Sequence, residues 1–226
     1  MLLFFNIFVT VAKKMTNSIH TQIARTLEKL PKGSLIFPSQ FLEIGSESAI
    51  KMSLSRLAKE NKVERLAHGI YINPKIDPLL GKIYPPIEEI AKAIAERDRV
   101  NIKPAGAYAL NRLGLSTQVP LNYVYITDGA ARSIVIGNRK IRFKATVPKK
   151  LATKGPISGL VIQALEELGP QKITPEILDK MIHFLKKENP TLLQHDAKLT
   201  SAWIARLFYT ILQQKPKDDE MVTTYQ

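Results

Sequence analysis

The segment 46–74 changes abruptly from a helical hydrophobic pattern to short β-prone runs. From residue 46 to about residue 61, apolar side chains recur at the spacing of one helix face: Ile50, Leu54, Leu57 and Ala58. Two β-prone runs, 63–66 and 70–72, follow directly and are joined through residues 67–69. This segment therefore predicts a helix followed at once by a tight β-hairpin, which Asn73 and Pro74 end.

The residues before this segment complete an order of elements that is typical of one kind of domain. Residues 17–30 carry apolar side chains at helical spacing and precede a Pro and Gly stop, which predicts an amphipathic helix. A short apolar run at 35–37 predicts a brief strand, and residues 39–44 predict a short second helix that Gly45 ends. Helix, strand, helix, helix and hairpin is the order of a winged helix-turn-helix, which we predict over residues 15–75.

Residues 76–214 predict a second, mixed domain behind a linker that contains Pro and Gly. Helices are expected over 86–98, 105–113, 157–168, 174–187 and 196–212. Strands are expected over 123–127, 133–136 and 141–146, with turns at Asp128-Gly129 and Gly137-Asn138, in an antiparallel meander. The predicted fold class is therefore α+β: an N-terminal winged helix-turn-helix followed by a mixed domain with a small antiparallel sheet and C-terminal helices.

The two ends of the chain are predicted to lie outside these domains. Residues 1–14 contain an apolar run of about a dozen residues, which is too short to span a membrane. The charges of Lys13 and Lys14 follow the run, whereas a signal peptide carries its charges before it. We therefore interpret Met15 as the natural start and residues 1–14 as an extension, and residues 215–226 as a polar tail.

Basic residues dominate the charge of the chain. Lys and Arg number 33 against 20 Asp and Glu, for a formal net charge of +13 and an isoelectric point near 9.8. This excess favours a polyanionic partner, and nucleic acid comes first. An anionic membrane would need a basic amphipathic helix with a bulky apolar face, which the sequence does not contain. The absence of cysteine excludes disulfides and thiolate metal sites and fits a cytoplasmic protein.

The predicted helix over 46–61 is the expected recognition helix, because its polar face is small and basic enough to enter a major groove of about 12 Å. The residues expected at base edges are Ser48, Lys51, Met52 and Ser55. Those expected nearer the phosphates are Gln40, Lys59 and Lys62, with Arg65 and His68 on the wing. The alternatives are that this face is merely solvated, or that the module binds protein.

A second basic cluster runs from Asp128 to Lys154 and holds eight cationic residues against one acidic residue. Its predicted patch comprises Arg132, Arg139, Lys140, Arg142 and Lys144. Arg142 and Lys144 alternate with Ile141 and Phe143, which predicts a sheet with one polar and one apolar face. The polar face is expected to follow a DNA backbone or to dock an acidic partner, and the alternative is an ordinary solvated sheet face.

The sequence contains no clear catalytic motif. The histidines, His20, His68, His183 and His195, lack metal-ligand spacing, and no glycine-rich phosphate loop is present. Gly45-Ser46 resembles the Gly-Ser of nucleotidyltransferases, but no pair of alternating carboxylates follows it to hold Mg²⁺. We therefore expect a protein that is not an enzyme and needs no metal or cofactor. A nuclease that the winged module delivers to DNA stays open as an alternative.

Two blocks of the sequence, 48–74 and 101–146, together resemble the AbiEi-type antitoxins of bacterial type IV toxin-antitoxin (abortive infection) systems. The likeness rests on the wing sequence Gly69–Tyr71, on the segment Ala109–Ser116 and on the strand entry Pro120–Thr127. It covers roughly residues 17–155.

This resemblance implies a repressor that binds inverted repeats of double-stranded DNA in its own promoter. It also implies an antitoxin that counters a nucleotidyltransferase-type toxin without having to bind that toxin directly. The alternative within the same class is a plain transcriptional regulator with a ligand-binding or dimerising C-terminal domain.

Overall fold

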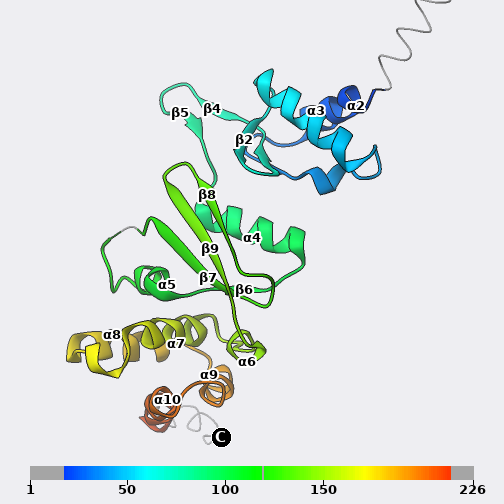
Figure 1. The fold of residues 1–226 in the computed structure, drawn as a ribbon. Coiled ribbons are helices and arrows are strands. Elements are labelled where there is room, and N and C mark those ends of the chain that lie inside the picture. Colours follow the sequence, from blue (N-terminus) through cyan, green and yellow to red (C-terminus); the bar gives the residue numbers. More distant parts are fainter. Residues whose placement is uncertain (1–17, 119, 215–226) are drawn as a thin grey trace, which may run out of the picture. The chain divides into compact units, whose positions relative to one another are not determined.

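The computed structural model describes residues 18–118 and 120–214, and the chain divides into two compact units. The first unit runs to Arg97 and includes Val135–Gly137, and the second holds Asp98–Ile134 and the chain from Asn138 onward. The fold is mixed α+β with small sheets and C-terminal helices, as predicted (Figure 1). The predicted extension over 1–14 and the predicted tail over 215–226 lie outside the described residues.

Two amphipathic helices form the core of the first unit. Helix α2 (Ile19–Lys29) begins at Ser18, whose Oγ accepts a hydrogen bond from the backbone N–H of Thr21. Helix α3 (Glu47–Lys59) begins at Ser46, whose Oγ accepts from the N–H of Ala49. These hydroxyls satisfy donors that the first helical turn leaves free. The apolar faces meet in one core, which contains Ile23, Leu27, Ile50, Leu54 and Leu57.

A small antiparallel sheet closes this core in the order β1-β3-β2. Its strands are β1 (Leu35–Ile36), β2 (Glu64–Ala67) and β3 (Ile70–Ile72). Strands β2 and β3 form the predicted hairpin, whose turn contains Gly69 at a φ of +67°, a backbone conformation that glycine adopts without strain. The order of elements in this unit is compatible with a winged helix-turn-helix.

The predicted helix over 39–44 is instead a single 3₁₀ turn, η1 (Pro38–Phe41), followed by a turn to Ile44. The chain passes close to α2 at Gly45. A Cβ at Gly45 would lie 2.5 Å from Cδ1 of Ile19. A larger residue at this position would therefore require the Ile19 side chain to move.

The segment predicted as a linker forms a two-stranded antiparallel hairpin of β4 (Lys75–Asp77) and β5 (Gly81–Ile83). The Asp77 carboxylate accepts hydrogen bonds from the N–H groups of Leu79 and Leu80, which closes the turn between the strands. Helix α4 (Ile87–Asp98) follows and matches the prediction over 86–98.

The second unit contains a four-stranded sheet in the order β6-β7-β9-β8. Its strands are β6 (Ile102–Pro104), β7 (Asn122–Thr127), β8 (Arg132–Ile136) and β9 (Arg139–Ala145). Strand β7 pairs in parallel with β9, so the predicted antiparallel meander is wrong. Strand β6, which the sequence did not predict, pairs antiparallel with the other edge of β7.

Burial and hydrogen bonding explain this strand order. Asp128-Gly129 was expected to be a tight hairpin turn, but the Asp128 carboxylate accepts two hydrogen bonds from Asn101, at 2.8 and 2.7 Å. Strand β8 contains no buried residue and takes the edge of the sheet, whereas β9 buries Ile141 and Phe143 and takes a central position. At the edge, Val135 of β8 is 61% exposed.

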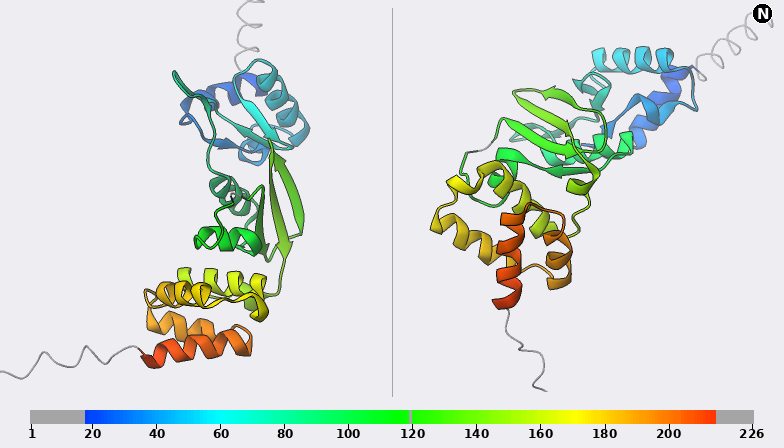
Figure 2. Two further views of the ribbon diagram at one scale, coloured as in Figure 1. Left: turned by 90° about the vertical axis from the view of Figure 1, so that its left-hand side faces the viewer. Right: turned by 60° about the horizontal axis from the view of Figure 1, so that its bottom comes forward.

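The remaining elements of the second unit are helical. They are α5 (Gly106–Arg112), α6 (Pro148–Leu151), α7 (Pro156–Leu168), η2 (Pro170–Lys172), α8 (Pro175–Leu185), α9 (Pro190–Ala197) and α10 (Ala202–Gln214). Helices α7 to α10 lie side by side in both views of Figure 2. They share one apolar core that includes Leu165, Met181, Leu193 and Phe208.

The single closing helix predicted over 196–212 is two helices, α9 and α10. Helix α9 starts earlier than predicted, at Pro190, which follows the capping residue Asn189. It ends where the N–H groups of Lys198 and Leu199 donate hydrogen bonds to carbonyl oxygens three residues earlier.

Within the described residues, no helix has both the length and the apolar character that crossing a membrane requires.

Candidate nucleic-acid interface

The exposed face of α3 carries the residues predicted to read base edges. Ser48, Lys51 and Met52 are exposed, and Ser55 is half-buried. On the opposite side of the same helix, Leu54 is fully buried. The 3.6-residue period thus separates an apolar face from a small polar face, as the sequence predicted.

Two of these side chains have partners on their own helix. The Lys51 Nζ lies 2.5 Å from a carboxylate oxygen of Glu47, one turn earlier. The hydrogen bond and the charge of Lys51 lower the pKa of Glu47. The Met52 sulfur accepts a hydrogen bond of 3.3 Å from the guanidinium of Arg56. Exposed ion pairs of this kind contribute little stability, so Lys51 is able to change partner at low cost.

The residues predicted to lie nearer the phosphates differ in their surroundings. Gln40 Oε1 accepts a hydrogen bond of 3.0 Å from the backbone N–H of Phe37, which leaves the amide NH₂ to donate elsewhere. Lys62 Nζ lies 3.2 Å from a carboxylate oxygen of Glu60. Lys59 is exposed on the last turn of α3. All three are accessible, but Gln40 and Lys62 also have structural partners.

The wing residues Arg65 and His68 contact each other at the tip of the β2–β3 hairpin. The Arg65 guanidinium lies 3.1 Å from His68 Nδ1, and its Nε donates to the carbonyl of Ala67 at 3.4 Å. Both residues are exposed. The tip therefore presents one cationic group whose position is fixed by its neighbours.

The β4–β5 hairpin is tied to the wing through Glu64, a contact that the sequence did not predict. The Glu64 carboxylate accepts hydrogen bonds from Lys82 Nζ at 2.8 Å and from the Tyr84 hydroxyl at 2.7 Å. Burial opposes ionisation of Glu64, but these two hydrogen bonds outweigh it and lower its pKa. Glu64 therefore remains charged and holds the two hairpins together.

The second basic patch is smaller than the sequence predicted. Arg132 forms an ion pair with Asp98, and its guanidinium lies 5.3 Å from the centre of the Phe143 ring. Arg132 is half-buried, and these contacts give it a structural role. Arg139 and Lys140 are exposed where β8 turns into β9.

Arg142 and Lys144 alternate with buried residues of β9, as predicted, but the face that carries them is one wall of a cleft. The cleft has a volume of about 700 Å³. Its other walls come from α5, from α7 and from α10, including Gly106, Gln163, Glu166, Glu167 and Trp203. The sequence did not predict this arrangement, because the helical walls come from segments that lie on both sides of the strand in the sequence: α5 precedes β9, and α7 and α10 follow it.

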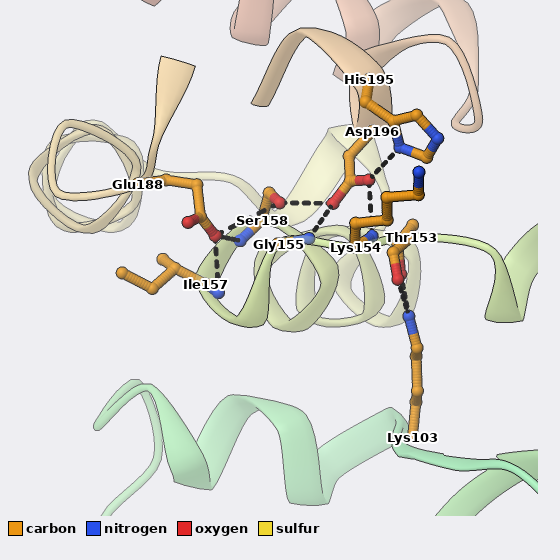
Figure 3. A network of polar contacts seen from close by, with 9 residues as sticks. All are labelled: Lys103, Thr153, Lys154, Gly155, Ile157, Ser158, Glu188, His195 and Asp196. Carbon is orange, nitrogen blue, oxygen red and sulfur yellow. Dashed lines mark hydrogen bonds and ion pairs between the residues drawn. The ribbon is translucent and has the colours of Figure 1, made fainter. Parts of the chain in front are cut away.

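A buried polar network lies at the N-terminus of α7 (Figure 3). The carboxylate of Asp196 accepts hydrogen bonds from the N–H groups of Lys154 and Gly155, at 2.8 and 2.9 Å. The carboxylate of Glu188 accepts from the N–H groups of Ile157 and Ser158, at 2.8 and 3.0 Å. Two carboxylates from other elements thus satisfy the free donors at this helix terminus.

The same network contains Ser158, His195 and Asp196, the residue types of a hydrolase triad, in a different geometry. Asp196 lies between the other two: its carboxylate accepts from the Ser158 hydroxyl at 2.6 Å and lies 2.8 Å from His195 Nδ1. A triad needs the histidine to contact the serine, and Ser158 is fully buried. The arrangement caps a helix and does not present a nucleophile.

The electrostatics of the network favour an ionised Asp196. Burial raises its pKa, but hydrogen bonds from Ser158, from His195 and from two backbone N–H groups outweigh burial and lower it. Lys103 reaches the same region and donates to the carbonyl and hydroxyl oxygens of Thr153. Burial lowers the pKa of Lys103, and the charge of Asp196 opposes that shift.

No group of three or more potential metal ligands comes together within residues 18–118 and 120–214. A family model matches residues 22–193 of the chain, and it represents DUF6088, a family of unknown function. The matched range begins in α2 and ends in α9, so it takes in parts of both units. No curated protein matches the sequence at a significant level.

Proposed function

Since the chain belongs to the DUF6088 family, whose function is unknown, we propose its function from its own residues: it is a non-enzymatic regulator that binds double-stranded DNA. The observation that supports this proposal is the exposed face of α3, small and basic, followed directly by the β2–β3 hairpin with Arg65 and His68 at its tip. A major groove about 12 Å wide admits such a helix, and a wing then reaches the adjacent backbone.

The proposed contacts fall into two groups. The residues at base edges are Ser48, Lys51, Met52 and Ser55. The residues at phosphates are Gln40, Lys59, Lys62, Arg65 and His68. The cationic members neutralise phosphates, and the Gln40 amide donates a hydrogen bond without adding charge.

We further propose that this regulator is cytoplasmic and represses its own promoter at inverted repeats, as the antitoxin of a type IV toxin-antitoxin system. This part of the proposal rests on the resemblance of segments 48–74 and 101–146 to AbiEi-type antitoxins. The functional partner is a nucleotidyltransferase-type toxin, whose direct binding is not required.

The DNA-binding proposal is tested by a gel-shift titration of the purified chain on its own upstream DNA, with excess non-specific competitor and at two salt concentrations. A complex that resists the competitor is expected. The variant Lys51→Ala with Ser55→Ala is expected to lose this complex, whereas Lys180→Ala, on the exposed side of α8, is expected to keep it. Equal retardation of promoter and competitor DNA would refute sequence-specific binding.

The antitoxin proposal needs a separate assay. Cells that express a nucleotidyltransferase-type toxin are expected to stop growing, and co-expression of this chain is expected to restore growth. Rescue by the Lys51→Ala, Ser55→Ala variant would separate neutralisation from repression. Failure of the wild-type chain to rescue growth would reject the antitoxin role and leave the regulator.

A second candidate function is a plain transcriptional regulator with a ligand-binding C-terminal domain. The cleft of about 700 Å³ beside β9 favours it, because this volume lies within the range of small-molecule sites. In this case promoter binding depends on a small molecule and growth rescue fails, so the two assays distinguish the candidates.

A further inference from the structure

The cleft beside β9 brings two cationic side chains to one wall. In the parallel pair of β7 and β9, Arg142 lies opposite Val124 and Lys144 lies opposite Ile126, and all four residues line the cleft. Ile141 and Phe143 point to the other face of the sheet and are buried. The strand therefore places Arg142 and Lys144 about 7 Å apart and facing the same space.

The charges of these two residues are available to a ligand. Within residues 18–118 and 120–214, neither side chain takes part in an ion pair. A third cation on the rim, Lys150, is already paired with Glu166 at 2.8 Å. An anion that enters the cleft therefore meets Arg142 and Lys144, which suit the bidentate and point-charge binding of phosphate oxygens.

A buried amide in the wall of the cleft points to the same conclusion. Gln163 of α7 is only 6% exposed and lines the cleft. No residue of the described chain forms a hydrogen bond with its side chain. The amide offers both a donor and an acceptor, so a polar ligand in the cleft is able to form hydrogen bonds with it.

The wall opposite the cations supplies groups that suit a nucleobase. Trp203, the only tryptophan of the chain, lines the cleft from α10, and aromatic rings of this kind stack on bases. Glu167 also lines the cleft, and its carboxylate accepts hydrogen bonds from base N–H groups. Gly106 lies beside Glu167 and has a φ of +61°, a backbone conformation that glycine adopts without strain.

We propose that this cleft binds a nucleoside phosphate, with Arg142 and Lys144 on the phosphates, Gln163 as a polar contact and Trp203 against the base. The volume of about 700 Å³ accommodates a single nucleotide, which is much smaller than the DNA duplex proposed for α3. The site lies in the second unit, so nucleotide binding and DNA binding are separable by mutation.

The test uses the purified full chain and titrates it with ATP, GTP, CTP and UTP, each alone. Binding is followed by Trp203 fluorescence and by calorimetry. At least one nucleotide is expected to give a saturable change and to bind at least about tenfold more tightly than inorganic tripolyphosphate, since the base adds stacking. Equal affinity for tripolyphosphate would refute the nucleoside part, and no saturable binding below about 1 mM would refute the site.

Variants assign the binding to the cleft. Arg142→Gln with Lys144→Gln is expected to weaken binding by at least about tenfold, because charge-assisted hydrogen bonds are lost. The control Arg139→Gln with Lys140→Gln removes the same charge from the same strand outside the cleft and is expected to bind normally. Equal losses in both variants would overturn the assignment.

Two further variants separate this inference from folding and from DNA binding. Gln163→Leu is expected to weaken nucleotide binding while keeping the thermal unfolding midpoint close to that of the wild type, because the amide forms no hydrogen bond within the described residues. Unchanged affinity in this variant would contradict the proposed contact. The Lys51→Ala, Ser55→Ala variant is expected to bind nucleotide normally, and weakened binding there would place the nucleotide site on the winged module.

Discussion

The hydroxyl of Ser158 donates a hydrogen bond of 2.6 Å to the carboxylate of Asp196, and both residues are fully buried. The contact joins the first turn of α7 to α9, and helix α8 lies between these two elements in the sequence. A carboxylate at this place compensates free N–H groups and the positive end of the helix dipole at once. The network therefore ties the C-terminal helices together from within.

Replacing Asp196 by alanine is expected to destabilise the second unit by about 3 kcal/mol, because four hydrogen-bond partners, two of them in buried contacts, lose their acceptor. The measurement is denaturant unfolding of the full chain followed by circular dichroism. Asp179→Ala, at an exposed position of α8, serves as the control and is expected to change little. Equal stability of both variants would show that the network contributes nothing to folding.

The pKa of Asp196 gives a dependence on pH with a definite sign. Its folded pKa lies below the ordinary value of 3.8, so its contribution is complete above the unfolded pKa and is lost as pH falls through the folded pKa. The stability difference between the wild type and Asp196→Asn is expected to stay constant above about pH 5 and to shrink below about pH 4. Unfolding curves of both proteins from pH 3 to pH 7 provide the check, and a constant difference throughout would contradict it.

Gly45 and Ile19 make a second testable pair. A Cβ at position 45 would lie 2.5 Å from Cδ1 of Ile19, so Gly45→Ala is expected to cost about 1–3 kcal/mol through overpacking. Ile19→Val removes Cδ1 and is expected to recover part of that cost in the double variant. A double-mutant cycle of unfolding free energies measures this coupling, and strict additivity would show that the two residues do not compete for space.

The periodic elements were predictable from the sequence, and their arrangement was not. Helix α3 was predictable because its apolar residues recur on one face of the helix. The alternation along β9 likewise predicts that Arg142 and Lys144 lie on the same face of the sheet. Strand β6 was missed because three residues ending in Pro carry no usable period. The order of the strands depends on contacts between segments far apart in the sequence, and local patterns do not contain them.

The candidate sites divide in the same way. The exposed polar face of α3 follows from one helix, so the sequence located Ser48, Lys51, Met52 and Ser55 together. The cleft combines a strand with helices from distant parts of the sequence, so no local pattern indicated Gln163 or Trp203. Arg132 shows what the sequence leaves out: its charge placed it in the predicted patch, and the structure adds its contacts with Asp98 and Phe143.

The wing provides the last prediction, which assumes that α3 binds DNA. Arg65 is held at the hairpin tip by Ala67 and His68, where a phosphate contact adds affinity and no sequence information. Arg65→Ala is therefore expected to weaken binding to promoter and competitor DNA alike, and to reduce the slope of log K against log salt by about 0.9. Gel-shift titrations at four salt concentrations measure this slope. The control is Glu43→Ala, at an exposed position beside η1. If Arg65→Ala lost affinity for promoter DNA alone, the wing would be assigned to base readout instead.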